Sequence, residues 1–193
     1  MRRGKRGNRA RPPRGGQGVE IREALHEGAR KLARDAQVDR ICEFVVRPPQ
    51  KADIVISIDA FEHFDDPESI LREMDSILAP DGEVWISFGP TWYHPLGGHL
   101  FSVFPWAHLV FNEKALIRWR SDFKNDGATR FSEVAGGLNR MSIARFERIV
   151  EASPLRIVSL AVVPIRQLKP LHNRWTREFT TAVVRCHLVK QTL

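Results

Sequence analysis

The stretch ISIDAFEHFDDP, residues 56–67, joins an apolar run to a concentration of reactive side chains. Asp59, Glu62 and His63 follow the apolar residues almost at once. Carboxylates and imidazoles exchange protons in catalysis, and imidazoles do so near neutral pH. A strand that only filled a core would end in a plain turn of Gly, Asn or Pro. The pattern therefore predicts a functional site directly after this run.

A second group of such side chains lies in residues 89–141, a long irregular segment rich in Gly, His and Trp. Its histidines and neighbouring aromatic residues are Trp92, Tyr93, His94, His99, Trp106 and His108. Two interpretations stay open: a substrate pocket with a histidine base, or a lid whose aromatic side chains pack on a sheet. The histidine spacing fits no recognised ligand motif, so we predict no metal site.

Regular elements on either side must position these groups. The near-continuous apolar run at 52–58 is typical of a strand buried on both faces of a parallel sheet. Asp66 and Pro67 predict a helix start, with Asp66 as the N-cap and Pro67 in the first turn. The turn APDG ends this helix, and a further strand is expected at 83–88.

The remaining pattern predicts an α/β fold. In chain order the other expected elements are a helix over 20–36, a strand at 41–46, a helix after Ser142, and strands at 155–163 and 180–189. Alternating helices and strands of this kind form a layered sheet. Ligands of open α/β sheets bind outside the carboxyl ends of the strands. We therefore expect a ligand crevice after the strands 52–58 and 83–88.

The charge of the chain is distributed unevenly. The net charge is +7, and the surplus lies in residues 1–17, which hold seven Arg or Lys residues and no acid. We predict a disordered basic tail over 1–17 and one domain over 18–193, with the insert at 89–141. The balanced body gives no reason to expect a broad phosphate-binding face. The tail is open to two interpretations, RNA binding and a solvated extension.

Cysteine usage and hydropathy place the chain among cytoplasmic proteins. Cys42 and Cys186 lie in apolar runs and are expected to be buried, reduced thiols. No apolar run is long enough to cross a bilayer, so no membrane partner is expected.

Residues 52–88 resemble the middle of the class I S-adenosylmethionine-dependent methyltransferases, of the methyltransferase type 11 kind. The strand, the E-H after it, the D-P helix start, the R-E within the helix and the L-x-P-x-G turn recur there in this order. The resemblance implies a Rossmann-like fold that ends in an antiparallel pair formed by 155–163 and 180–189. It also implies S-adenosylmethionine as the cofactor and a small-molecule methyl acceptor.

The resemblance also implies roles for individual residues. Glu20, followed by Ile21, would hold the cofactor ribose, and Asp59, Ala60 and Phe61 would flank the methionine end. The implied catalytic residues are His63, His94 and His99, and the implied acceptor-site residues are Trp92, Tyr93, His94 and His99. Structural alternatives stay open. Glu20 suits a helix N-terminus, residues 59–61 suit a simple loop, and Glu62 with His63 could organise that loop.

The sequence departs from this family in two places. No G-x-G-x-G loop precedes Glu20, and the link RPPQK lacks the acid that usually follows the third strand. We therefore expect a methyltransferase without its first strand and helix, either truncated in nature or read from a wrong start. The strand at 52–58 would then have an unpaired edge. A non-catalytic remnant that acts as a binding module is the alternative function.

Overall fold

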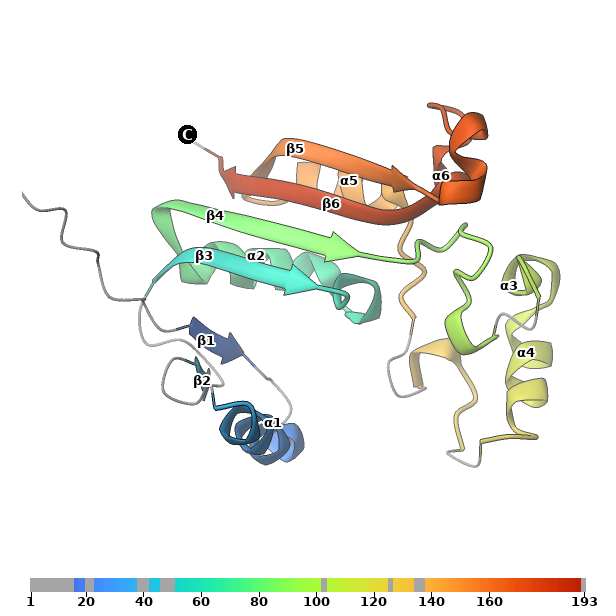
Figure 1. Cartoon of the computed structure of the whole chain (residues 1–193), viewed down its shortest axis with the longest axis horizontal. Helices are drawn as coiled ribbons and strands as arrows, with labels where there is room; N and C mark the ends of the chain where they lie inside the picture. The colour runs from blue at the N-terminus through green and yellow to red at the C-terminus, as the bar shows by residue number, and fades with distance from the viewer. Residues whose placement is uncertain are drawn as a thin grey trace, which may run out of the picture. The chain divides into compact units, whose positions relative to one another are not determined.

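The computed structural model describes residues 16–19, 23–37, 42–45, 51–101, 104–124, 127–133 and 138–191. The chain divides into two compact units, residues 1–51 and 52–193 (Figure 1). Glu20 and Ile21, the predicted ribose-binding residues, lie outside the described residues, as does everything before Gly16.

The first unit contains two parallel strands and one helix. Strand β1 (Gly16–Val19) pairs with β2 (Cys42–Val45), and helix α1 (Glu23–Asp35) lies between them in the chain. The predicted helix and second strand are thus confirmed. Gly16 and Gln17, at the end of the predicted tail, pair with Cys42 and Glu43 in the sheet.

The second unit is built on a four-stranded sheet in the order β3-β4-β6-β5. Its strands are β3 (Ala52–Ile58), β4 (Leu78–Phe88), β5 (Leu155–Pro164) and β6 (Thr181–Lys190). The β3–β4 pair is parallel and the other two pairs are antiparallel. The α/β fold and its closing antiparallel pair are therefore confirmed.

Strand β4 begins earlier than predicted. It starts at Leu78 rather than at Glu83, so the residues APDG belong to the strand instead of forming a turn before it. The register explains the difference, because Ala52 pairs with Leu78 but Ile54 pairs with Glu83. The extra residues of β4 are accommodated in that irregularity.

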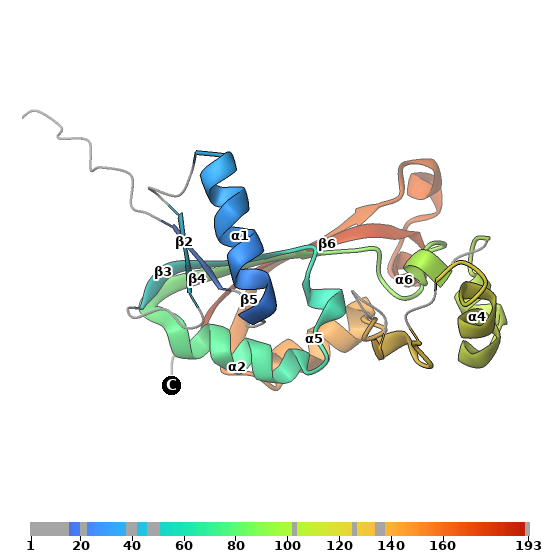
Figure 2. The same ribbon diagram turned by 90° about the horizontal axis from the view of Figure 1, so that it is seen from below.

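Two helices cover one face of this sheet (Figure 2). Helix α2 (Pro67–Ile77) begins as predicted, with the Asp66 carboxylate accepting a hydrogen bond from Ser69 N at 2.9 Å. Helix α5 (Ile143–Glu151) begins at Ser142, whose hydroxyl accepts from Arg145 N at 3.1 Å. The buried core between sheet and helices includes Phe61, Leu71, Val84, Phe88, Phe146, Val184 and Leu188. Burial there also raises the pKa of the Cys186 thiol to about 12.

The opposite face of β3 is apolar and exposed within this unit. Ile54, Ile56 and Ile58 are 57%, 63% and 65% exposed, so within this unit the strand is buried on one face. The reason is that α2 and α5 pack on the other face, where Val55 joins the core. Among the described residues β3 pairs with β4 alone. The absence of a central strand from the protein stays a prediction.

The insert is more ordered than its sequence indicates. It contains α3 (Ala107–Val110), α4 (Glu113–Arg120) and the short 3-10 turns η2 (His99–Phe101) and η3 (Phe131–Glu133). Phe101, Leu116, Phe131 and Leu138 form a second, smaller core. Between β5 and β6 lie η4 (Arg166–Leu171) and α6 (Arg177–Thr180). No helix in the described part of the chain is long and apolar enough to cross a membrane.

Candidate active site at the carboxyl ends of two parallel strands

Two loops meet where β3 and β4 end. The loop after β3 contains Asp59 to His63, and the loop after β4 starts at Gly89. The parallel pairing of Ile58 with Ser87 brings both strand ends to one edge of the sheet. Asp59 N then donates to Ser87 O at 2.8 Å, which fixes the first loop to the second strand. The sequence prediction that these strand ends adjoin is confirmed.

Glu62 joins the two loops. Its side chain is 3% exposed, and its Oε1 accepts a hydrogen bond from Gly89 N at 3.2 Å. Its Oε2 is buried and has no hydrogen-bond partner among the described residues. Burial raises the pKa of this carboxyl, and the hydrogen bonds and the neighbouring His63 oppose the rise. Glu62 therefore organises the loops, as one of the open interpretations proposed.

Three histidines lie close together beyond this carboxyl. The rings of His63 and His99 contact edge to face, with centroids 5.2 Å apart. Burial lowers the pKa of His99, and the charges of His63, His94 and His108 add to the effect, while a hydrogen bond to Pro90 opposes it. Burial also lowers the pKa of His94. The lowered pKa values favour the neutral form of His94 and His99, which can accept a proton.

Buried polar atoms without partners mark the same region. His99 Nε2 and Thr91 Oγ1 have no hydrogen-bond partner among the described residues. The Nδ1 of His108 is also unpaired, whereas its Nε2 lies 2.6 Å from Trp92 O and must donate to it. An unpaired buried polar group is costly, so each such atom in a native structure calls for an explanation. A bound ligand that supplies the missing partners is one.

The end of the insert returns to hold the loop after β3. Asn139 Nδ2 donates to the carbonyl oxygens of Phe61 and Phe64, each at 2.9 Å, and Asn139 N donates to Glu62 O at 3.0 Å. Two residues later, Met141 O accepts from Trp92 N at 2.7 Å. The same strap therefore fixes both loops of the site.

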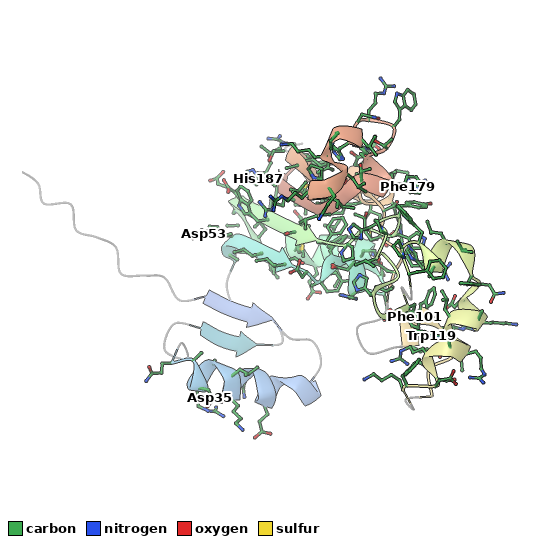
Figure 3. All side chains as sticks on the ribbon, turned by 45° about the vertical axis from the view of Figure 1, so that its right-hand side comes forward. Asp35, Asp53, Phe101, Trp119, Phe179 and His187 are labelled. Carbon is green, nitrogen blue, oxygen red and sulfur yellow. The ribbon has the colours of Figure 1, made fainter. Side chains whose placement is uncertain are left out.

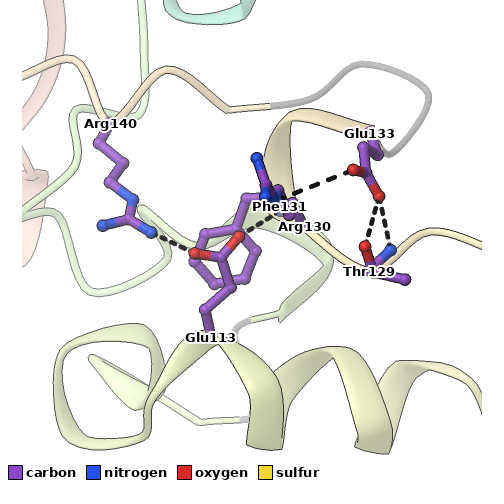
Figure 4. A network of polar contacts seen from close by, with 6 residues as sticks. All are labelled: Glu113, Thr129, Arg130, Phe131, Glu133 and Arg140. Atoms are coloured by element: carbon purple, nitrogen blue, oxygen red, sulfur yellow. Dashed lines mark hydrogen bonds and ion pairs between the residues drawn. The ribbon is translucent and has the colours of Figure 1, made fainter.

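Arg140, within this strap, belongs to a polar network on the insert (Figure 4). Its guanidinium contacts Glu113 at 2.5 Å, and Glu113 also accepts from Phe131 N at 2.6 Å. The guanidinium lies over the ring of Trp92, 5.3 Å from its centroid. The network connects α4, η3 and the strap, so it stabilises the insert next to the site.

Strained backbone occurs at the same positions. Asp59, His99 and Arg140 have φ values of 49°, 49° and 58°, in the left-handed region that non-glycine residues rarely adopt. Such residues persist only where the surrounding structure fixes them, and they concentrate at functional sites. Here each one is found in a loop or strap that the hydrogen bonds above hold.

The structure separates the predicted site residues into three groups. His63, His94 and His99 come together, and Asp59 and Ala60 lie at the end of β3 with at least partial exposure. Phe61 does not point to a ligand site, because its side chain is fully buried and packs on Phe88 and Phe146. Only its backbone remains available for the predicted cofactor contact.

The predicted acceptor aromatics Trp92 and Tyr93 are partly buried and contact other aromatic side chains. Trp92 contacts His108 and Phe131, and so belongs to the second core. Tyr93 packs against Phe179, 5.3 Å between centroids, and its carbonyl accepts from the Trp106 indole at 2.9 Å.

Sequence reasoning missed Asn139, Arg140 and Thr91. No local pattern distinguishes them, because their roles depend on backbone groups distant in the chain. His108 was noticed only as one histidine of the insert. Among the described residues no group of His, Cys, Asp or Glu is placed to hold a metal ion.

Residues 16–86 match the methyltransferase domain family. No curated protein sequence matches the chain. Among solved structures, the mitomycin 7-O-methyltransferase is 18% identical, with a TM-score of 0.55 over 92% of this chain and 42% of that one. The YcgJ protein of Bacillus subtilis is 14% identical, with a TM-score of 0.54 over 93% of this chain and 84% of its own.

A third similar structure is a putative methyltransferase of Haloferax volcanii in complex with the Trm112 activator. It is 16% identical, with a TM-score of 0.53 over 92% of this chain and 73% of that chain. The present chain spans about two fifths of the length of the mitomycin enzyme, 42%. At these identities the structures establish the fold. The chain therefore has the Rossmann-like fold of the class I S-adenosylmethionine-dependent methyltransferases, and the resemblance carried by residues 52–88 is confirmed.

Proposed function

We propose that the protein transfers a methyl group from S-adenosylmethionine to a hydroxyl group of a small molecule. The observation that supports this most is the neutral His99, with an unpaired Nε2, beside the ends of two adjacent parallel strands. The methyltransferase fold and the O-methyltransferase activity named for one similar structure support the same chemistry.

The residues at the end of β3 fit the methionine end of the cofactor. Asp59 presents an exposed carboxylate there, and Ala60 is small and partly exposed. A carboxylate suits a ligand that carries an ammonium and a sulfonium charge. When bound, S-adenosylmethionine supplies a methyl group attached to a positively charged sulfur. Glu20, for the ribose, stays a prediction.

His99 would act on the acceptor. Its Nε2 would take the proton of the acceptor hydroxyl, which would leave an oxyanion as the nucleophile for the methyl group that the bound cofactor would supply. His63, edge-on to the His99 ring, and the Pro90 hydrogen bond hold the imidazole in place. Methyl transfer depends mainly on alignment, and a base contributes roughly a hundredfold or more where the nucleophile must lose a proton.

A non-catalytic remnant is the competing function, and one observation favours it. Trp92 and Tyr93, the expected acceptor-site residues, pack against other aromatic side chains, Phe131 and Phe179. A chain of this kind could keep the fold and bind a partner without turnover.

The test is methyl transfer from radiolabelled S-adenosylmethionine to a panel of small phenols and alcohols. We expect turnover that falls about a hundredfold or more in His99→Gln, with cofactor affinity unchanged. His172→Gln is the matched control, since His172 bonds Thr180 Oγ1 at 2.8 Å and belongs to the β5–β6 connection. Full activity in His99→Gln would exclude the base, and cofactor binding without turnover on any acceptor would favour the remnant.

A further inference from the structure

Two segments meet at one end of the second unit. Phe88, the last residue of β4, pairs with Val184 near the start of β6, so the segment after β4 and the segment before β6 leave the sheet together. Tyr93 of the first segment contacts Phe179 of the second. Figure 1 shows α3 and α6 at this end, and Figure 3 labels Phe179 there.

The first segment is uncharged and exposes apolar side chains. Between Glu83 and Glu113 the sequence contains no Asp, Glu, Lys or Arg. Around α3, Val110 is 69% exposed, and Phe104 and Phe111 are 45% and 46% exposed with their rings in contact. An exposed patch of this kind marks a contact surface in proteins that are otherwise covered by charge.

The second segment combines exposed apolar side chains with positive charge. Trp175 and Leu171 are 78% and 62% exposed, and the Arg174 guanidinium lies 4.4 Å from the Trp175 ring centroid. Between Pro164 and Glu178 the sequence has four basic residues and no acid: Arg166, Lys169, Arg174 and Arg177.

Glu178, the acid that follows these residues in the sequence, forms no ion pair with them among the interactions described. Its carboxylate accepts hydrogen bonds from Ile143 N and Ala144 N, at 3.0 Å and 2.8 Å, at the start of α5. Of the four cations only Arg177 has an ion pair, with Glu147, among the interactions described. The overall charge balance of the body therefore conceals a local basic surface that sequence totals did not reveal.

We infer that this end of the second unit, residues 104–111 and 165–177, docks on the surface of a bilayer that contains anionic lipid. Trp, Leu, Val and Phe side chains enter the interfacial region, where Trp is particularly favoured. Each basic residue near an anionic surface contributes about 1 kcal/mol. A surface contact of this kind needs no spanning helix, and the expectation of no membrane partner rested only on the absence of one.

A nucleic acid fits this surface less well. Its phosphates could pair with the cations, and one base could stack on Trp175. It would leave Leu109, Val110 and Leu171 exposed to water, because aliphatic side chains have little to gain from phosphate and sugar. A bilayer satisfies both the charge and the apolar area, so we commit to the lipid surface.

The test is co-sedimentation of the full chain with vesicles of phosphatidylcholine alone or with about 30% phosphatidylserine, at physiological salt. The basic N-terminal tail would also attract anionic vesicles. The measurement is therefore repeated on the full chain with the seven basic residues of 1–17 replaced by Ser. We expect binding to the anionic vesicles in both forms and little binding to phosphatidylcholine alone.

Two double variants test the apolar contacts. Val110→Ser/Phe111→Ser and Leu171→Ser/Trp175→Ser should each weaken vesicle binding about tenfold, since each removes apolar area worth at least 1–2 kcal/mol. The control is Phe123→Ser, which removes a side chain that is 69% exposed but outside both segments. Circular dichroism checks that each variant is folded. Brominated lipid should also quench Trp fluorescence less in Trp175→Phe than in the wild type.

The outcomes separate the possible partners without using methyl transfer. Loss of binding when only the tail is changed, or equal binding by both double variants and wild type, would overturn the inference. Competition by polyuridylate that depends on Trp175 but not on Val110 would identify a nucleic-acid surface instead. Absence of binding to anionic vesicles even at low salt would also overturn it.

Discussion

The carboxylate of Glu62 accepts a hydrogen bond at 3.2 Å from the backbone N–H of Gly89, which lies 27 residues later in the chain. This one contact joins the loops at the ends of β3 and β4, and it is buried. The contact holds the Glu62 carboxylate next to His63 and away from solvent. We therefore assign Glu62 the structural role of joining the two loops.

Glu62→Gln should change how stability depends on pH. The pKa of Glu62 is raised in the folded state, so the folded protein holds its proton more firmly than the unfolded chain. This contribution to stability is present at acid pH and is lost as pH rises from about 4.5 through the raised pKa. Gln keeps an acceptor for Gly89 N but does not ionise. Urea unfolding at several pH values should show a flatter profile for Glu62→Gln, and parallel profiles would contradict us.

A buried histidine should affect the pH dependence of stability in the opposite direction to Glu62, by lowering stability at acid pH. Burial lowers the pKa of His108, so below about pH 6.5 the unfolded chain binds a proton that the folded protein resists. Stability from this residue is complete above 6.5 and falls as the pH drops through the lowered pKa. His108→Asn should lose part of this acid sensitivity in urea unfolding between pH 7.5 and 5. An unchanged difference between those pH values would show that His108 titrates normally.

Asn139→Ala should destabilise the second unit. It removes two side-chain hydrogen bonds to the carbonyl oxygens of Phe61 and Phe64, and we expect a loss of about 1–3 kcal/mol in the free energy of unfolding. The control is Gln167→Ala, an exposed position in η4. Hydrogen exchange should speed up in residues 59–64 specifically. Equal effects of the two substitutions would mean that Asn139 does not hold this loop.

Glycine substitutions provide a matched pair. A Cβ at Gly97 would lie 2.2 Å from Trp92 O, a backbone atom that cannot move cheaply, so Gly97→Ala should cost about 1–3 kcal/mol. A Cβ at Gly28, within α1, meets nothing within 4 Å, and Gly28→Ala should add about 0.5–1 kcal/mol to helix stability. Thermal unfolding followed by circular dichroism measures both. A tolerated Gly97→Ala would refute the tight turn after β4.

Local chemistry explains what could be predicted from the sequence. The caps Asp66 and Ser142 and the strand at 52–58 depend on residues near each other in the chain, and all are confirmed. The antiparallel pair, which the family resemblance implied, is also confirmed. The exposure of Ile54, Ile56 and Ile58 could not be predicted this way. The sequence of an apolar strand is the same whether or not a second layer of helices covers it, because that layer comes from elsewhere in the chain.

The same distinction applies to the candidate site. The strand ends and the histidines could be identified, since parallel strands bring their carboxyl ends to one edge. The role of Asn139 could not be predicted, because its side chain donates to the carbonyl oxygens of Phe61 and Phe64. These residues lie 78 and 75 positions earlier in the chain. The burial of the Phe61 side chain could not be predicted for a related reason. Next to polar residues it resembles a ligand contact, but the neighbouring helix α5 brings Phe146 against it.

Calorimetric titration of the full chain with S-adenosylmethionine and S-adenosylhomocysteine tests the proposed function most directly. We predict saturable binding of both, with an affinity in the micromolar range, about −8 kcal/mol. Glu20→Ala and Asp59→Asn should each weaken it, while Asp122→Asn, an exposed acid paired with Arg118 on the insert, should not. Absence of detectable binding by the folded wild-type chain would contradict the proposal that it is a methyltransferase.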